Sequence, residues 1–263
     1  MSRFTSYPAG SPCWVDLMTP DVDRGKAFYT AVFGWEPVDS VDPTGTVVYT
    51  NFMLGGQTVA GMGATAPGMA PMAIWNTYIA TADAAATAAA VTAAGGSVMM
   101  PPMAVFDAGT MAVFTDPTGA AFSVWQAGEH VGASVANEAD TWSWNELLTR
   151  DVESAKAFYT SVFGWSYEDQ PMSDGAYTVI AGGDNGGYGG VMSMPPELPD
   201  EVPNHWMVYF FVDDVDAVAA RVTAAGGTIA NGPFDVPGVG RIAVVHDDQN
   251  GSFSLMQPGV PEG

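Results

Sequence analysis

Positively charged side chains are scarce in this chain of 263 residues. Lys and Arg together number 7, against 29 Asp and Glu, so the formal net charge is −22 at pH 7. Such a surface repels phosphate backbones and anionic lipid headgroups. The composition therefore argues against nucleic acid and membranes as partners, and the acidity itself is explained by a solvated surface that keeps the protein in solution.

Cysteine and long apolar runs are also missing. Cys13 is the only cysteine, which excludes an internal disulfide and a zinc site built from several thiolates. No stretch reaches the ~18 unbroken apolar residues of a membrane span, and the segment Met1–Cys13 lacks the apolar run of a secretory signal. We therefore predict a cytoplasmic protein.

Histidine is rare, and the common catalytic motifs are absent. His130, His205 and His246 do not form the HxH or HxxxH spacing of a metal site, and we expect His130, in a polar stretch, to be exposed. No P-loop, dinucleotide-binding glycine pattern or G-x-S-x-G motif occurs. Kinases, dinucleotide-dependent enzymes and serine hydrolases are therefore set aside, and no cofactor is expected.

The chain contains two copies of one sequence. KAFYTAVFGW at Lys26–Trp35 returns as KAFYTSVFGW at Lys156–Trp165, an offset of 156 − 26 = 130 residues, and VTAAGG at Val91–Gly96 returns at Val222–Gly227. A period this long indicates a duplicated domain rather than a solenoid repeat. We predict a first domain at 1–127, a linker at 128–140 and a second domain at 141–263.

Within each copy, strand-like and helix-like patterns alternate. Apolar residues from Val22 to Phe33 fall on one face of a helix that Gly34 ends, and the alanine-rich stretch Ala84–Ala94 predicts a second helix. The predicted strands of the first copy are 13–18, 46–53, 58–62, 75–80, 97–100, 109–115 and 121–126. These seven strands and two helices approximate the order strand, helix, three strands taken twice per copy, so we predict an α+β fold of four βαβββ units.

These patterns resemble a known superfamily. The helix Asp21…Phe28-Tyr29…Phe33-Gly34-Trp35, the helix start Val212–Asp216 and the hairpin Asp116-Pro-Thr-Gly119 carry the likeness. Together they resemble the vicinal oxygen chelate superfamily of glyoxalase I, bleomycin-resistance proteins and extradiol dioxygenases, in particular its two-domain actinobacterial members labelled hydroxylase. The resemblance implies two tandem glyoxalase-like domains, each with a U-shaped sheet around a cleft.

The resemblance also implies where a metal would be held. Enzymes of the superfamily place His, Glu or Gln ligands on the first, fifth and eighth strands of a domain. The matching positions here are Trp14, Asn76 and Ser123 in the first copy and Trp144, Met207 and Ser254 in the second. Because these are poor ligands for a divalent metal, we expect no metal site. An alignment slip of two residues would bring Asp16 or Glu146 into the first position, which leaves a divalent metal as the alternative.

Two carboxylates are the candidate catalytic groups. Asp16 and Glu146 follow Trp14 and Trp144 by two residues, so each shares a strand face with its tryptophan. If that face lines a cleft, the pKa of the carboxyl would be raised and the group could act as a general base. The alternative is a structural carboxylate that accepts hydrogen bonds from backbone or hydroxyl groups.

Aromatic residues give the candidate clefts their character. The predicted ligand-binding residues are Trp14, Asn76, Tyr78, Ser123 and Trp125 in the first copy and Trp144, Met207, Tyr209 and Ser254 in the second. We expect Trp75 and Trp206 to pack under the helices instead. Aromatic walls with a few polar groups suit a flat small molecule.

Three functions remain open. The first is a protein that binds a hydrophobic or aromatic small molecule without a metal. The alternatives are a metal-dependent lyase of the glyoxalase type and a hydroxylase or dioxygenase. Because both domains are in one chain, we expect a monomer whose domains pack as a pseudo-dimer, or a homodimer.

Overall fold

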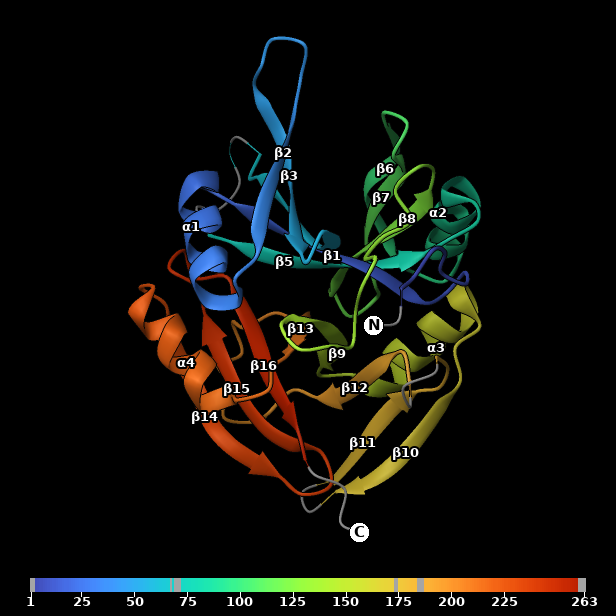
Figure 1. Ribbon diagram of the computed structural model, residues 1–263. Coiled ribbons are helices and arrows are strands. Elements are labelled where there is room, and N and C mark those ends of the chain that lie inside the picture. Colours follow the sequence, from blue (N-terminus) through green and yellow to red (C-terminus); the bar gives the residue numbers. More distant parts are fainter. Residues whose placement is uncertain (1–2, 67, 69–71, 173–174, 184–186, 260–263) are drawn as a thin grey trace.

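The protein consists of two similar halves, each built around one eight-stranded sheet (Figure 1). The computed structural model describes residues 3–66, 68, 72–172, 175–183 and 187–259. We call the half that contains β1–β8 domain 1 and the half that contains β9–β16 domain 2. The predicted α+β fold of four βαβββ units in two tandem domains is confirmed.

The elements of the two domains follow the same order. Domain 1 contains β1 (Pro12–Thr19), α1 (Val22–Phe33), β2 (Glu36–Val41), β3 (Val47–Leu54), β4 (Gln57–Ala64), β5 (Ile74–Ala80), α2 (Ala84–Ala93), β6 (Ser97–Val105), β7 (Gly109–Thr115) and β8 (Ala121–Ala127). Domain 2 contains β9 (Thr141–Thr149), α3 (Val152–Phe163), β10 (Tyr167–Met172), β11 (Gly175–Ile180), β12 (Gly189–Ser193), β13 (His205–Phe211), α4 (Val215–Ala224), β14 (Thr228–Val236), β15 (Gly240–His246) and β16 (Ser252–Pro258).

Local signals place the helices where the sequence predicts them. Asp21 caps α1 by accepting a hydrogen bond from the Arg24 amide, and Gly34 ends the helix in the left-handed conformation at φ 71°. Asp151 and Gly164 do the same for α3. The helix predicted to end at Ala94 ends at Ala93, with Ala94 as its C-cap.

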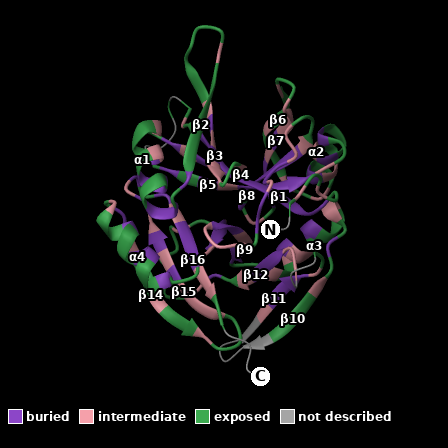
Figure 2. Ribbon diagram, in the orientation of Figure 1, coloured by how far each residue is buried: buried purple, intermediate pink, exposed green. Residues whose placement is uncertain are grey.

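One strand of domain 1 escaped the prediction. β2 has the sequence EPVDSV and every residue in it is exposed (Figure 2). An edge strand with solvent on both sides shows no apolar alternation, which is the signal that reveals a strand in a sequence.

The strand order gives each sheet two distinct faces. In domain 1 the order is β2-β3-β4-β1-β5-β8-β7-β6, and domain 2 has the equivalent order. Thr77 on β5 hydrogen-bonds Asn145 on β9, 2.9 Å away, so Thr77 marks the face turned toward the other domain. The opposite face, which carries Asp16 in domain 1 and Glu146 in domain 2, is called the inner face below. The hairpins β2–β3 and β6–β7 project from domain 1 away from domain 2 (Figure 1).

The two domains share their cores. One buried cluster joins Phe28 and Trp35 of domain 1 to Phe210 and Phe253 of domain 2, and a second joins residues of β8 and α2 to α3. α1 lies beside α4, and α2 beside α3 (Figure 1). Phe28, Tyr29 and Trp35 are buried in a core that belongs to both domains.

Candidate functional site

The inner face of domain 1 carries a buried carboxylate at its centre. Asp16 on β1 lies opposite Gly61 on β4 and opposite Asn76 on β5. One row further along, Trp14 lies opposite Tyr78, which in turn pairs with Ser123 on β8. Period two therefore places these side chains on one face, as the sequence predicts for Trp14 and Asp16.

Three side chains donate hydrogen bonds to Asp16. The Asn76 amide lies 2.8 Å from Oδ1, and the Tyr78 and Tyr49 hydroxyls each lie 3.0 Å from Oδ2. Tyr49 in turn accepts a hydrogen bond of 3.1 Å from the Trp14 indole nitrogen. Asp16 is 3% exposed, and the three side chains that donate to its carboxylate are all neutral.

Domain 2 repeats part of this arrangement. The Tyr209 hydroxyl donates to Glu146 Oε2 over 2.7 Å, and the Trp144 indole donates to Tyr177 over 2.9 Å. Glu146 lies opposite Gly190, but Met207 occupies the place of Asn76. The second carboxylate therefore lacks the amide donor of the first.

Burial dominates the acid–base properties of both clusters. Desolvation raises the pKa of Asp16 above its ordinary value, although hydrogen bonds from Asn76, Tyr78 and Tyr49 oppose the shift. Burial likewise raises the pKa of Glu146, against hydrogen bonds from Tyr209 and Tyr177. Each carboxyl thus has the raised pKa expected of a general base and also the hydroxyl donors expected of a structural group.

His130 is not exposed as the sequence suggested. Its ring packs against Trp14 at 4.6 Å and Trp125 at 5.7 Å between centroids, and its Nε2 is buried without a hydrogen bond in the part of the chain that the structure describes. Burial lowers the pKa of this imidazole. The prediction was wrong because the segment after β8 turns back: the His130 amide bonds Ala108 and its carbonyl accepts from Trp125.

The positions that the resemblance assigned to metal ligands hold other residues. Trp14, Asn76 and Ser123 lie on the inner face of domain 1, where Trp14 and Asn76 bond other side chains. Trp144, Met207 and Ser254 occupy the same places in domain 2, and the Ser254 hydroxyl is buried without a partner among the described residues. Within that described part, no group of three or more His, Cys, Asp or Glu side chains could hold a metal ion. The donor set therefore does not fit a divalent metal.

Two tyrosines of these clusters were missed by the sequence analysis. Tyr49 and Tyr177 each precede a threonine, Thr50 or Thr178, that bonds the outward-facing Asp39 or Asp169. The recurring Tyr-Thr pair was a usable signal, but its offset of 177 − 49 = 128 residues departs from the 130 of the helix repeat. Trp75 and Trp206 pack under the helices as predicted, where they donate to Tyr29 and Tyr159.

Two cavities lie away from the inner faces. One of about 290 Å³ lies between the N-terminal segment and domain 2 and is lined partly by Tyr7, Trp142 and Tyr188. The other, of about 320 Å³, lies between the ends of α2 and α3. Neither has an acidic or histidine side chain in its described lining, so neither competes with the carboxylate clusters as a site of chemistry.

The chain belongs to the Glyoxalase/Bleomycin resistance protein/Dioxygenase superfamily, whose family model matches residues 13–124 and 141–252. The match covers one stretch in each domain, so both copies carry the family pattern. The resemblance seen in the sequence is thereby confirmed.

Two groups of relatives extend over nearly the whole chain. "Putative glyoxylase CFP32" of Mycobacterium tuberculosis is 46% identical over 263 residues, covering 98% of each chain. "Anthracycline biosynthesis protein DnrV" of Streptomyces peucetius is 37% identical over 268 residues, covering 96% of this chain and 95% of the relative.

Solved structures agree on the fold. The Mn(II)-bound glyoxalase from Novosphingobium aromaticivorans superposes with a TM-score of 0.65 at 20% identity, over 98% of this chain and 83% of that one. The 2,3-dioxygenase LapB from Pseudomonas sp. KL28 gives 0.66 at 13% identity, over 96% and 93%. At these identities the likeness concerns architecture alone. Among the described residues, the helices are all too short or too polar to cross a bilayer.

Proposed function

We propose that the protein binds a planar aromatic small molecule on an inner face, without a metal ion. The observation that carries this proposal is the donor set. Where a metal enzyme of the superfamily has its ligands, this chain has Trp, Asn and Ser or Trp, Met and Ser, and the nearby carboxylates are engaged by tyrosines. Aromatic walls with a few polar groups are what a flat ligand requires.

The relatives support this ligand class. One group is named for anthracycline biosynthesis, and anthracyclines contain a planar, oxygenated, fused aromatic ring system. We therefore propose sequestration of an oxygenated polycyclic aromatic compound as the function of this chain.

A lyase of the glyoxalase type is the second candidate. It is favoured by the name of the mycobacterial relative and by two buried carboxyls whose pKa is raised by desolvation. In that case Asp16 or Glu146 would act as the general base. The lyase would also need a bound metal ion, which the described donors do not fit. A hydroxylase or dioxygenase has weaker support, because the likeness to dioxygenases concerns the fold alone.

Metal analysis and ligand titration together separate these candidates. We expect purified, untagged protein to contain less than stoichiometric zinc, nickel, iron and manganese, and to bind 1,4-dihydroxyanthraquinone with quenching of tryptophan fluorescence. If near-stoichiometric metal resists dialysis and the protein is active on an aldehyde–thiol adduct, the lyase becomes the favoured function and the binding proposal is rejected.

A further inference from the structure

We infer that the ligand lies on the inner face of domain 1 and that the inner face of domain 2 is filled by its own side chains. The inference rests on the proposed function and adds to it which of the two faces is used and how the ligand is oriented. The evidence is a set of differences between equivalent residues of the two copies.

The outer wall of the domain 1 inner face carries an exposed apolar side chain, Val38. Asp16 on β1 lies opposite Gly61 on β4, Gly61 lies opposite Asn51 on β3, and Asn51 lies opposite Val38 on β2. Since paired residues share a face of the sheet, Val38 lies on the same inner face as Asp16. Val38 is 53% exposed, although it faces the site.

The other arm of domain 1 presents a matching wall. Met103 on β6 lies opposite Met111 on β7, which lies opposite Trp125 on β8. Trp125 is buried, Met111 is partly buried and Met103 is 48% exposed, so an apolar strip runs from the floor to the rim of this arm. Apolar side chains exposed on both sides of a polar centre are typical of a binding surface.

The equivalent wall of domain 2 is polar. Gln170 lies opposite Tyr177, and Glu168 lies opposite Val179, so both Gln170 and Glu168 face inward on β10. They take the places of Ser40 and Val38 in domain 1, where Ser40 lies opposite Tyr49. A carboxylate on this wall disfavours an apolar ring system, because its desolvation would be uncompensated.

The floor of domain 2 is also occupied. Beside Met18 in domain 1 lies Gly63, which has no side chain, whereas beside Leu148 in domain 2 lies Met192. Leu148, Met194, Met207 and Tyr209 form a buried cluster of their own, against which Met192 and Val202 pack. The loop that carries Val202 is held by the Arg150 guanidinium, which donates to the carbonyls of Val202 and Pro199 over 2.7 and 3.0 Å.

Asn76 defines which edge of the ligand reaches the floor. One N–H of its side-chain amide donates a hydrogen bond to Asp16, and the residue is partly exposed. Among the described residues the amide oxygen and the second N–H of Asn76 have no other partner, so they offer a ligand an acceptor and a donor side by side. A hydroxyl next to a carbonyl on a fused aromatic ring matches this pair, so the ligand class is a hydroxylated polycyclic quinone whose oxygenated edge contacts Asn76.

Exchanging equivalent residues tests the inference. Gly63→Met and Val38→Glu give domain 1 the residues of domain 2, and Met192→Gly with Glu168→Val are the matched controls in the other copy. Affinity for 1,4-dihydroxyanthraquinone is measured by tryptophan quenching, with circular dichroism and thermal unfolding to establish folding. A Cβ at Gly63 would first meet the flexible Met18 side chain at 3.3 Å, and Val38 is exposed, so both variants should fold.

We expect each domain 1 variant to weaken binding by at least ~10-fold and each domain 2 variant to change it by less than ~2-fold. Should only the domain 2 variants weaken binding, domain 1 is not the site, while the proposed function stands. Should the unaltered protein show no binding up to ~100 μM probe, the proposed function fails, and the inference with it. If Gly63→Met does not fold, unchanged affinity in Val38→Glu alone overturns the inference.

Discussion

At the scale of single residues, glycine places the tyrosines that hold the two carboxylates. A Cβ added at Gly61 would meet the Tyr49 hydroxyl and ring, and one at Gly190 would meet Tyr177. The tyrosine can lie flat across the neighbouring strand and reach the carboxylate only because these positions lack a side chain. Glycine is needed here for close approach and not for its backbone freedom.

Gly61→Ala should therefore displace Tyr49 from Asp16. We expect a loss of about 1–3 kcal/mol in the free energy of unfolding, because a buried acceptor and the Trp14 indole lose a partner. Urea unfolding measures the loss. Gly63→Ala on the same strand is the control, since its Cβ would press only on the movable Met18 side chain at 3.3 Å and would lie in ordinary contact with the Tyr49 ring at 3.6 Å. An equal loss there would contradict the explanation.

Asp16 should make stability depend on pH. Since burial raises its folded-state pKa, the native protein binds this proton more tightly than the unfolded chain does. As the pH rises from about 4, the ordinary Asp pKa, through the raised folded-state pKa, Asp16 lowers the free energy of unfolding. The wild type should lose stability relative to Asp16→Asn over that range.

Urea unfolding of both proteins between about pH 4 and pH 8 gives the difference. Asp39→Asn is the control, because hydrogen bonding from Lys26 and Thr50 lowers the Asp39 pKa and its contribution is lost only as the pH falls. Curves for wild type and Asp16→Asn that stay parallel would show that Asp16 does not titrate in this range.

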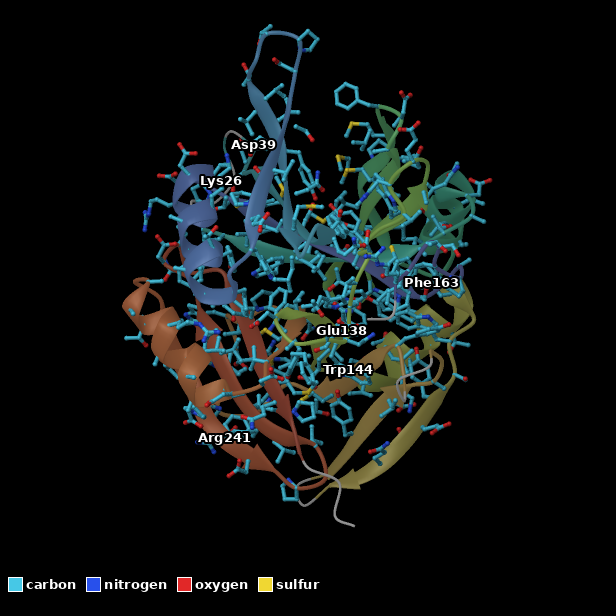
Figure 3. The ribbon with its side chains drawn as sticks, in the orientation of Figure 1. Lys26, Asp39, Glu138, Trp144, Phe163 and Arg241 are labelled. Atoms are coloured by element: carbon cyan, nitrogen blue, oxygen red, sulfur yellow. The ribbon has the colours of Figure 1, made fainter. Side chains whose placement is uncertain are left out.

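At the scale of elements, the β2–β3 arm is a hairpin joined to α1 by an ion pair between Lys26 and Asp39. Lys26 and Asp39 lie next to each other in Figure 3, with 2.7 Å between Nζ and Oδ2, and Asp39 also accepts from Thr50. The equivalent contact in domain 2, Lys156 to Asp169, is longer at 3.4 Å. The ion pair therefore anchors the arm that we propose as one wall of the site.

Removing this anchor should loosen the arm without unfolding the domain. Because both side chains are partly exposed, we expect Asp39→Asn to cost less than about 1 kcal/mol in global stability. Amide hydrogen exchange in residues 36–54 should nevertheless become faster. Asp169→Asn is the matched variant in domain 2, and similar acceleration of its own hairpin would mean that the shorter contact has no special role.

At the scale of the whole molecule, the domains are fastened by the same contact used twice. Tyr29 of domain 1 donates to Asp247 of domain 2 over 2.8 Å, and Tyr159 of domain 2 donates to Asp116 of domain 1 over 3.2 Å. Each hydroxyl also accepts from a tryptophan of its own domain. Together with the shared cores, these contacts make the two halves one folding unit.

We therefore expect one cooperative thermal transition, with calorimetric and van't Hoff enthalpies in agreement. Tyr29→Phe should lower its midpoint, with a loss of about 1–3 kcal/mol, because the Trp75 indole and Asp247 lose a buried partner. Differential scanning calorimetry of both proteins tests this. A transition that splits into two would show that the domains unfold independently.

Much of the fold could be predicted because its signals are local. Helical spacing and the caps at Asp21 and Gly34 fix α1, and the period of two along β1 places Trp14 and Asp16 on one face. The 130-residue repeat establishes the duplication without any structure. β2 could not be recognised, since solvent on both sides removes the pattern that burial imposes.

By itself, the sequence determined the superfamily, the four units, the helices and the pairing of a carboxylate with a tryptophan in each copy. Only the tertiary structure showed that Tyr49 and Asn76 donate to Asp16 and that His130 packs against Trp14. It also showed that the two domains share their hydrophobic cores. The physical reason is the distance along the sequence between the residues that interact. Caps and periodicity act within a few residues, whereas these contacts depend on strand order and domain packing between segments tens to hundreds of residues apart.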